Sequence, residues 1–170
     1  FWTEAGPRRW FTKDEAFDAV FRDRFLPTHE AAARGELPGW PADAQGALAM
    51  AVLLDQFPRN AFRGSARAFA TDALARVAAH RAVSTGLDRQ VPDPGLRNFL
   101  YLPFMHSEWL PDQQRAVQLC SELGGEAERH ARIHHDIVAR FGRFPHRNPL
   151  LGRHTTPEEQ AFLDAGGFAG

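Results

Sequence analysis

The sequence predicts a soluble, all-α protein built from pairs of antiparallel helices. Apolar residues recur at helical spacing along most of the 170 residues, whereas alternating runs of strand type are almost absent. Helix starts and stops follow one another at short distances, so consecutive helices should pack side by side in opposite directions. We therefore expect a right-handed stack of helix pairs or an irregular bundle, folded as a single domain over residues 1–170.

The first two expected helices cover residues 13–25 or beyond and residues 42–56. Thr12 and Glu15 stand three apart and predict a capping box, in which each side chain bonds the other residue's amide. The segment Pro38-Gly39-Trp40-Pro41 then interrupts the chain. The second helix is apolar on nearly all sides, which places it in the middle of the fold.

The next two helices are expected over about 66–83 and 95–109. The apolar side of the third helix should include Leu74 and Val77 together with several alanines. Asp93 and Pro94 form a good N-cap and first turn for the fourth helix. Pro103 should bend that helix, because proline lacks an amide donor and crowds the preceding turn.

The last three helices are expected to begin near residues 111, 126 and 157. In the fifth, Ala116, Cys120 and Leu123 share one face, and two glycines at 124 and 125 end it. The sixth should run from 126 to 141. Thr156 and Glu159 around a proline form a capping box for a short final helix.

Composition excludes several classes of protein. A net charge of −1 argues against broad binding to nucleic acid or to an anionic membrane surface. No apolar run approaches the roughly 20 residues needed to span a bilayer. The single cysteine, Cys120, excludes a disulfide framework and a cysteine-based zinc site, and it favours a cytoplasmic location. The sequence gives no oligomeric state.

Basic residues gather in one stretch of this nearly neutral chain. No acidic residue lies between Asp136 and Glu158, although four arginines and two histidines do. Arginine pairs with carboxylate or phosphate through two parallel hydrogen bonds, so this stretch is a candidate anion site. The alternative is that these arginines cap helix C-termini.

Asp55 and the turn that follows it form a first candidate centre. Helical spacing places Asp55 on the buried side of its helix, where a carboxylate needs a cation or several donors. The expected turn Phe57-Pro58-Arg59-Asn60, with Arg63 beyond, supplies both. The structural alternative is a helix-ending turn held by an Asp–Arg pair.

A second loop repeats this design. The segment Phe144-Pro145-His146-Arg147-Asn148 again places an arginine and an asparagine after Phe-Pro. If the two loops converge, their guanidinium groups would surround one hollow walled by phenylalanine. Such a hollow suits a carboxylate or phosphate on an apolar body.

Histidines supply two weaker candidates. His106, Ser107 and Glu108 are adjacent, and helical neighbours diverge by about 100°, so they cannot form a catalytic triad in series. His106 is expected to face inward, either as a core histidine or as a general acid or base. His130 and His134 stand four apart, but a third ligand is missing, so we expect no metal and no cofactor.

Three motifs together resemble a bacterial family, domain of unknown function 924. They are Leu54 to Asn60 with the Phe62-Arg63-Gly64 that follows, Leu102 to Glu108, and Phe141 to Asn148 with Leu151-Gly152-Arg153. The resemblance covers nearly the whole chain and implies a tetratricopeptide-like, right-handed α-α superhelix. It implies no activity. The candidate positions that coincide with the family pattern are Asp55, Arg59, Asn60, His106, Glu108, His134, Arg143, His146, Arg147, Asn148 and Arg153.

The leading hypothesis is a binding protein for a small anionic metabolite or an acidic peptide end. The anion would contact four arginines, with the asparagines adding hydrogen bonds and the two carboxylates orienting the guanidiniums. These residues are Arg59, Arg63, Arg143 and Arg147, then Asn60 and Asn148, then Asp55 and Glu108. The first alternative is a hydrolase or lyase that uses His106 or His146 as acid or base. The second is a scaffold that binds a protein partner.

Overall fold

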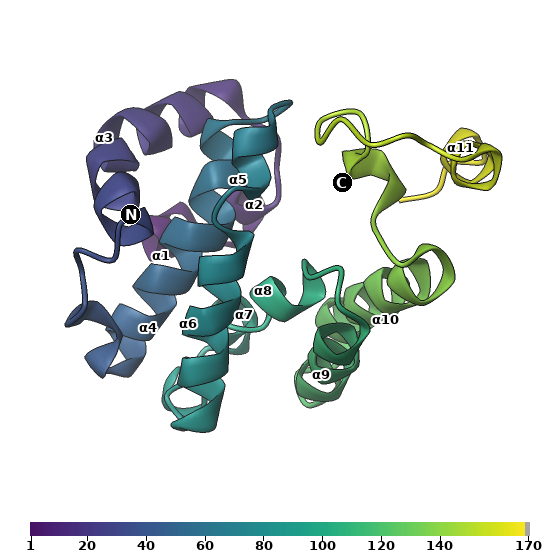
Figure 1. Cartoon of the computed structure of the whole chain (residues 1–170). Helices are drawn as coiled ribbons and strands as arrows, with labels where there is room; N and C mark the ends of the chain where they lie inside the picture. Colours follow the sequence, from purple (N-terminus) through teal and green to yellow (C-terminus); the bar gives the residue numbers. More distant parts are fainter. Residues whose placement is uncertain (169–170) are drawn as a thin grey trace. The chain divides into compact units, whose positions relative to one another are not determined.

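The computed structural model describes residues 1–168, which form helices and turns without a strand (Figure 1). The all-α prediction is therefore confirmed. The chain divides into two compact units. The N-terminal unit comprises residues 1–63 and 67–103, and the C-terminal unit comprises residues 64–66 and those from 104 onward. The tetratricopeptide-like superhelix and the single domain over 1–170 stay predictions.

The N-terminal unit begins with two short helices, followed by a long one. These are α1 (Trp2–Ala5), α2 (Pro7–Trp10) and α3 (Glu15–Ala33). The predicted capping box at Thr12 was wrong. The N-cap of α3 is Asp14, whose carboxylate accepts the amide of Phe17 at 3.0 Å, while the Thr12 hydroxyl donates to the carbonyl of Arg8. An ionised aspartate complements the helix dipole as well as bonding the amide.

A continuous helical stretch follows, made of α4 (Ala44–Ala51), a π-helical turn (Val52–Gln56) and α5 (Phe57–Ala61). The amide of Phe57 donates to the carbonyl of Val52, five residues earlier. The predicted end of the helix at Gln56 was therefore wrong, and the expected turn at 57–60 is helical. The π-helical turn places Pro58 in the first turn of α5, where a missing amide donor does little harm.

The remaining helices of this unit are α6 (Asp72–Ser84) and α7 (Pro94–Asn98). The apolar face predicted for α6 was wrong. Leu74 and Val77 are 42% and 67% exposed, whereas Ala75, Ala79 and Ala82 are fully buried. Alanines let backbones approach closely, and Ala75 accordingly packs in a core cluster that includes Leu54.

The expected helix over 95–109 is broken into pieces. After α7 the chain turns, and α8 (Leu102–Met105) begins one residue before Pro103. A proline inside a longer helix would clash with the carbonyl four residues earlier. Here the helix is interrupted instead of bent, and the interruption avoids that clash. His106 and Glu108 consequently lie beyond the end of α8, in non-helical backbone.

The C-terminal unit contains three further helices: α9 (Leu110–Ser121), α10 (Gly125–Phe141) and α11 (Pro157–Asp164). Helices α9 and α10 pack against each other, joined by a tight connection over 122–124 (Figure 1). The capping box at the start of α11 is confirmed, since Thr156 and Glu159 bond each other's amides. Within residues 1–168, no helix is long and apolar enough to cross a membrane.

The buried face of α6 makes a first testable prediction. Ala75→Leu should lower the free energy of unfolding by about 1–3 kcal/mol, because a larger side chain has no room at a fully buried position. Val77→Leu on the exposed face should change it by less than about 0.5 kcal/mol. Denaturant unfolding monitored by circular dichroism measures both. Equal losses of stability in the two variants would contradict the finding that Ala75 is buried and Val77 is exposed.

Candidate functional site

Asp55 lies at the centre of a buried ion network in the N-terminal unit. Its side chain is fully buried, lies 3.2 Å from the guanidinium of Arg59 and accepts the Gln56 amide at 2.7 Å. Arg59 also makes two hydrogen bonds, of 2.8 and 3.1 Å, to the carboxylate of Asp72. Arg59 is thus paired with two carboxylates of its own unit. The pair with Asp55 was the alternative predicted from sequence, whereas Asp72 was not predicted.

Asn60 and Arg63 meet a different carboxylate. Asp18 of α3 accepts the Asn60 side-chain amide at 2.6 Å and is bound by two nitrogens of Arg63. This network joins α3 to the end of α5 through a partly buried charge pair. The guanidinium of Arg63 is therefore held by the protein itself, like that of Arg59.

In the C-terminal unit, Glu159 of α11 gathers the polar groups of the second loop. Its carboxylate binds Arg143 through two hydrogen bonds of 2.6 and 2.8 Å. It also accepts the side-chain amide of Asn148 at 3.2 Å and the backbone amide of Thr156 at 2.8 Å. The hydrogen bonds from Arg143 lower the pKa of Glu159 to about 2, outweighing its burial, so the carboxylate stays ionised.

Glu108 holds the start of the second loop. Its carboxylate accepts the backbone amide of Phe144 and the guanidinium of Arg153, both at 2.9 Å. Burial raises the pKa of Glu108, but these hydrogen bonds and the charge of Arg147 lower it more, to a net value below its usual range. Glu108 therefore pairs with Arg153, and its expected role in orienting anion-contacting arginines stays a prediction.

His134 and His146 lie against the rings of Phe144 and Phe168, and His106 lies beside His134. The ring of His134 lies 6.1 Å from that of His106, 5.5 Å from Phe144 and 4.5 Å from Phe168. His146 lies 5.4 Å from Phe168. The His134 Nδ1–H donates to the carbonyl of His130, which fixes the tautomer. Burial, together with His106, lowers the pKa of His134 to about 3, so this imidazole is neutral at pH 7.

Arg147 is buried beside this cluster, with its guanidinium carbon 4.5 Å above the ring of Phe144. A guanidinium over an aromatic face is stabilised by the ring quadrupole. Among residues 1–168, no group of three or more histidine, cysteine, aspartate or glutamate side chains is arranged to hold a metal ion. The structure thus places the predicted residues in two sets, one in each unit, and the shared hollow stays a prediction.

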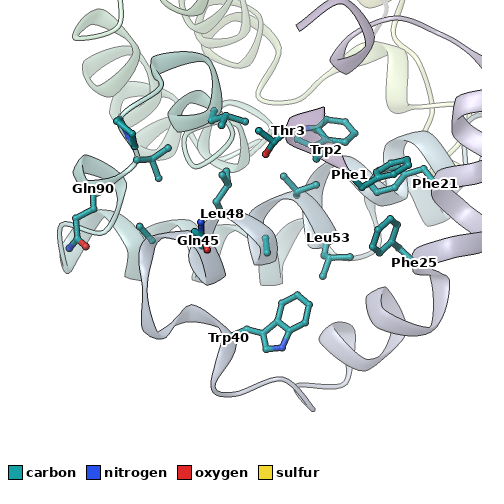
Figure 2. A pocket seen from close by; sticks show the side chains of 16 residues that line it. Phe1, Trp2, Thr3, Phe21, Phe25, Trp40, Gln45, Leu48, Leu53 and Gln90 are labelled. Carbon is teal, nitrogen blue, oxygen red and sulfur yellow. The ribbon is translucent and has the colours of Figure 1, made fainter. Parts of the chain in front are cut away.

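A hollow of the N-terminal unit lies elsewhere, in a cavity of about 540 Å³ walled by α1, α3 and α4 (Figure 2). None of the side chains that line it is charged. They are Phe1, Trp2, Thr3, Phe21, Phe25, Trp40, Ala44, Gln45, Leu48, Ala49, Val52, Leu53, Gln90, Val91, Pro92 and Leu96.

Sequence reasoning missed both the cavity and the carboxylates that neutralise the arginines. Asp18, Asp72 and Glu159 are 42, 13 and 16 residues away from the groups they bind at Asn60, Arg59 and Arg143. No local spacing connects such pairs. The sequence held one signal of the cavity, the four-residue spacing of Phe21 and Phe25 in α3, both of which line it.

Comparisons with known proteins place this chain among bacterial proteins whose function is unknown. Residues 1–167 match the model of a family described as bacterial protein of unknown function (DUF924). A solved structure of a protein of unknown function from Agrobacterium tumefaciens is 55% identical, with a TM-score of 0.95. The match covers 97% of this chain and 93% of that one. Among curated proteins, none matches.

The hydrogen bonds of Glu159 make a second prediction. Glu159→Gln should lower the free energy of unfolding by about 1–3 kcal/mol, because it removes a buried charge and sets an amide donor against the donors of Arg143, Asn148 and Thr156. The adjacent Glu158 pairs with Arg140 on the surface, so Glu158→Gln should change it by less than about 0.5 kcal/mol. Similar losses in the two variants, measured by urea unfolding, would exclude a special role for Glu159.

The neutral imidazole of His134 makes a third prediction, on acid sensitivity. Its pKa is about 3 in the folded protein and about 6.5 in the unfolded chain, so the unfolded chain alone gains a proton between these values. Stability should therefore fall as the pH drops below 6.5, by about 2 kcal/mol at pH 5 from this residue.

His134→Phe should remove that part of the pH dependence, and His135→Gln at the half-exposed neighbouring position should not. Urea unfolding at pH 7.5, 6.0 and 5.0 gives the slope for each protein. An unchanged slope in His134→Phe would contradict the assignment.

Proposed function

We propose that this chain, which belongs to the DUF924 family of bacterial proteins of unknown function, binds an uncharged, mainly apolar small molecule in the cavity of its N-terminal unit. The observation that carries the proposal is a cavity of about 540 Å³ without a charged side chain in its lining. Ligand sites in proteins are hollows of about 300–1,000 Å³, lined mainly by apolar and aromatic groups with a few polar ones. This cavity has that composition.

The lining also decides the charge of the ligand. The floor includes the buried side chains of Trp2, Phe21, Val52 and Leu53. A carboxylate or phosphate placed there would lose its hydration without gaining a counter-ion, which is strongly unfavourable. An apolar ligand would instead be driven in by removal of its surface from water. An uncharged molecule is therefore the ligand that the cavity favours.

This proposal departs from the anionic ligand expected from sequence. An anion at Arg59, Arg63, Arg143 or Arg153 would compete with a carboxylate already bound by each guanidinium. An anion that displaces the internal carboxylate leaves that carboxylate without its cation, so the exchange contributes little favourable binding free energy. The arginine-centred anion site, an enzyme that uses His106 or His146, and a protein-binding scaffold are the competing hypotheses.

The test uses an uncharged fluorescent probe, N-phenyl-1-naphthylamine, whose emission rises in apolar surroundings. The wild-type protein should bind it. Leu48→Trp should weaken binding at least about tenfold, or 1.4 kcal/mol, because the larger ring fills the cavity. Leu74→Trp, on the exposed face of α6 and outside the cavity lining, should leave binding unchanged.

Equal binding by the two tryptophan variants would reject the cavity as the site. A thermal-shift panel run alongside separates the other hypotheses. Stabilisation by inorganic phosphate that disappears in Arg143→Ala would favour the anion site. Turnover of an ester or phosphoester that is lost in His106→Ala would favour the enzyme, and recovery of a partner without any small-molecule response would favour the scaffold.

A further inference from the structure

We infer that the cavity holds its ligand in one orientation, with an apolar or aromatic body at one end and an uncharged hydrogen-bonding head at the other. This inference rests on the proposed function and names the class of ligand: a neutral amphiphile whose head is an amide, ester or alcohol. It follows from the unequal chemistry of the two ends of the cavity.

The body end is built from phenylalanine rings. The ring of Phe1 lies 5.3 Å from that of Phe21 and 5.2 Å from that of Phe25, and Phe21 and Phe25 are 5.6 Å apart. In Figure 2 these three rings lie together at one end of the cavity. The guanidinium of Arg24 stacks over both Phe1 and Phe25, which holds the rings in place.

The head end carries the amides. Gln45 lies in the first turn of α4, and Gln90 ends a short helical turn that packs against α4. Figure 2 shows Gln90 at the opposite end of the cavity from the phenylalanines, with Gln45 between them. Both side chains line the cavity and are exposed to solvent, and neither makes a hydrogen bond with the described residues.

Two glutamine amides select for a neutral head. Each offers two N–H donors and one carbonyl acceptor and carries no charge at any pH between 4 and 9. They can donate to and accept from an amide, ester or hydroxyl head. A carboxylate or ammonium head would use only one half of each amide and would meet no charged side chain in the lining, so it should bind more weakly on the same body.

The experiment compares three ten-carbon competitors that differ only in the head: decanamide, decanoate and decylamine. Each displaces N-phenyl-1-naphthylamine from the protein at pH 7.5, where the two controls are charged. Decanamide should compete at least about fivefold more strongly than either charged competitor. In the double variant Gln45→Leu/Gln90→Leu this preference should fall below about twofold.

Two further variants control for unspecific effects. Gln114→Leu changes an exposed glutamine of α9, outside the cavity lining, and should keep the wild-type preference. Gln45→Lys adds a cation at the head end and should move the preference toward decanoate. It therefore tests the orientation even if the double variant folds poorly.

The outcomes separate this inference from the proposed function. If the probe fails to bind wild-type protein, or binds Leu48→Trp equally well, the cavity is not the site and both ideas fail. If the probe binds in the cavity but decanamide and decanoate compete equally, only the orientation fails. The same holds if the double variant keeps the preference or if Gln45→Lys leaves it unchanged.

Discussion

The N-terminal unit depends on how three successive carbonyls in its central helix are satisfied. The Phe57 amide donates to Val52 and Pro58 has no amide, so the carbonyls of Leu53 and Leu54 lose their regular helical donors. Side chains supply hydrogen bonds here: His29 donates to Leu53 at 2.8 Å, Thr71 to Leu54 at 2.6 Å, and Arg59 to the neighbouring carbonyl of Asp55 at 2.8 Å. These donors come from α3, from the residue before α6 and from α5. The same carbonyls therefore fix α3 and the start of α6 against the continuous stretch of α4, the π-helical turn and α5, and α3 is one wall of the cavity.

This arrangement also explains where the charges lie. Burying the central helix brings Asp55 into the interior, where it needs a cation, and Arg59 supplies it. Arg59 also donates to the carboxylate of Asp72 and to the backbone carbonyl of Asp55. In the C-terminal unit, Glu159 and Glu108 play the same part for Arg143 and Arg153. Arginines that suggested an anion site from sequence thus serve the internal electrostatics of each unit.

Sequence predicted what depends on local spacing and missed what depends on distant partners. The all-α class and the capping box of α11 follow from residues within one turn of each other, and both are confirmed. The face of α6 could not be predicted, because Ala75 is selected for close packing while the more apolar Leu74 and Val77 are exposed. The π-helical turn could not be predicted either, because the side chains that bond its carbonyls, His29 and Thr71, are distant in sequence. Asp55 was correctly assigned a cationic partner on the simpler ground that a buried carboxylate requires one.

The absence of charge from the cavity follows from the same constraint. Along α3, Asp18 faces α5 and is occupied by Asn60 and Arg63, whereas Phe21 and Phe25 face the cavity. Along the central helix, Asp55 belongs to the ion network, whereas Val52 and Leu53 line the hollow. Asp18 and Asp55 are thus engaged in internal pairs, and the side chains that these two walls place on the cavity side are uncharged. A hollow produced in this way has no charged side chain in its lining, so under the proposed function its selectivity comes from shape and from the neutral amides at its exposed end.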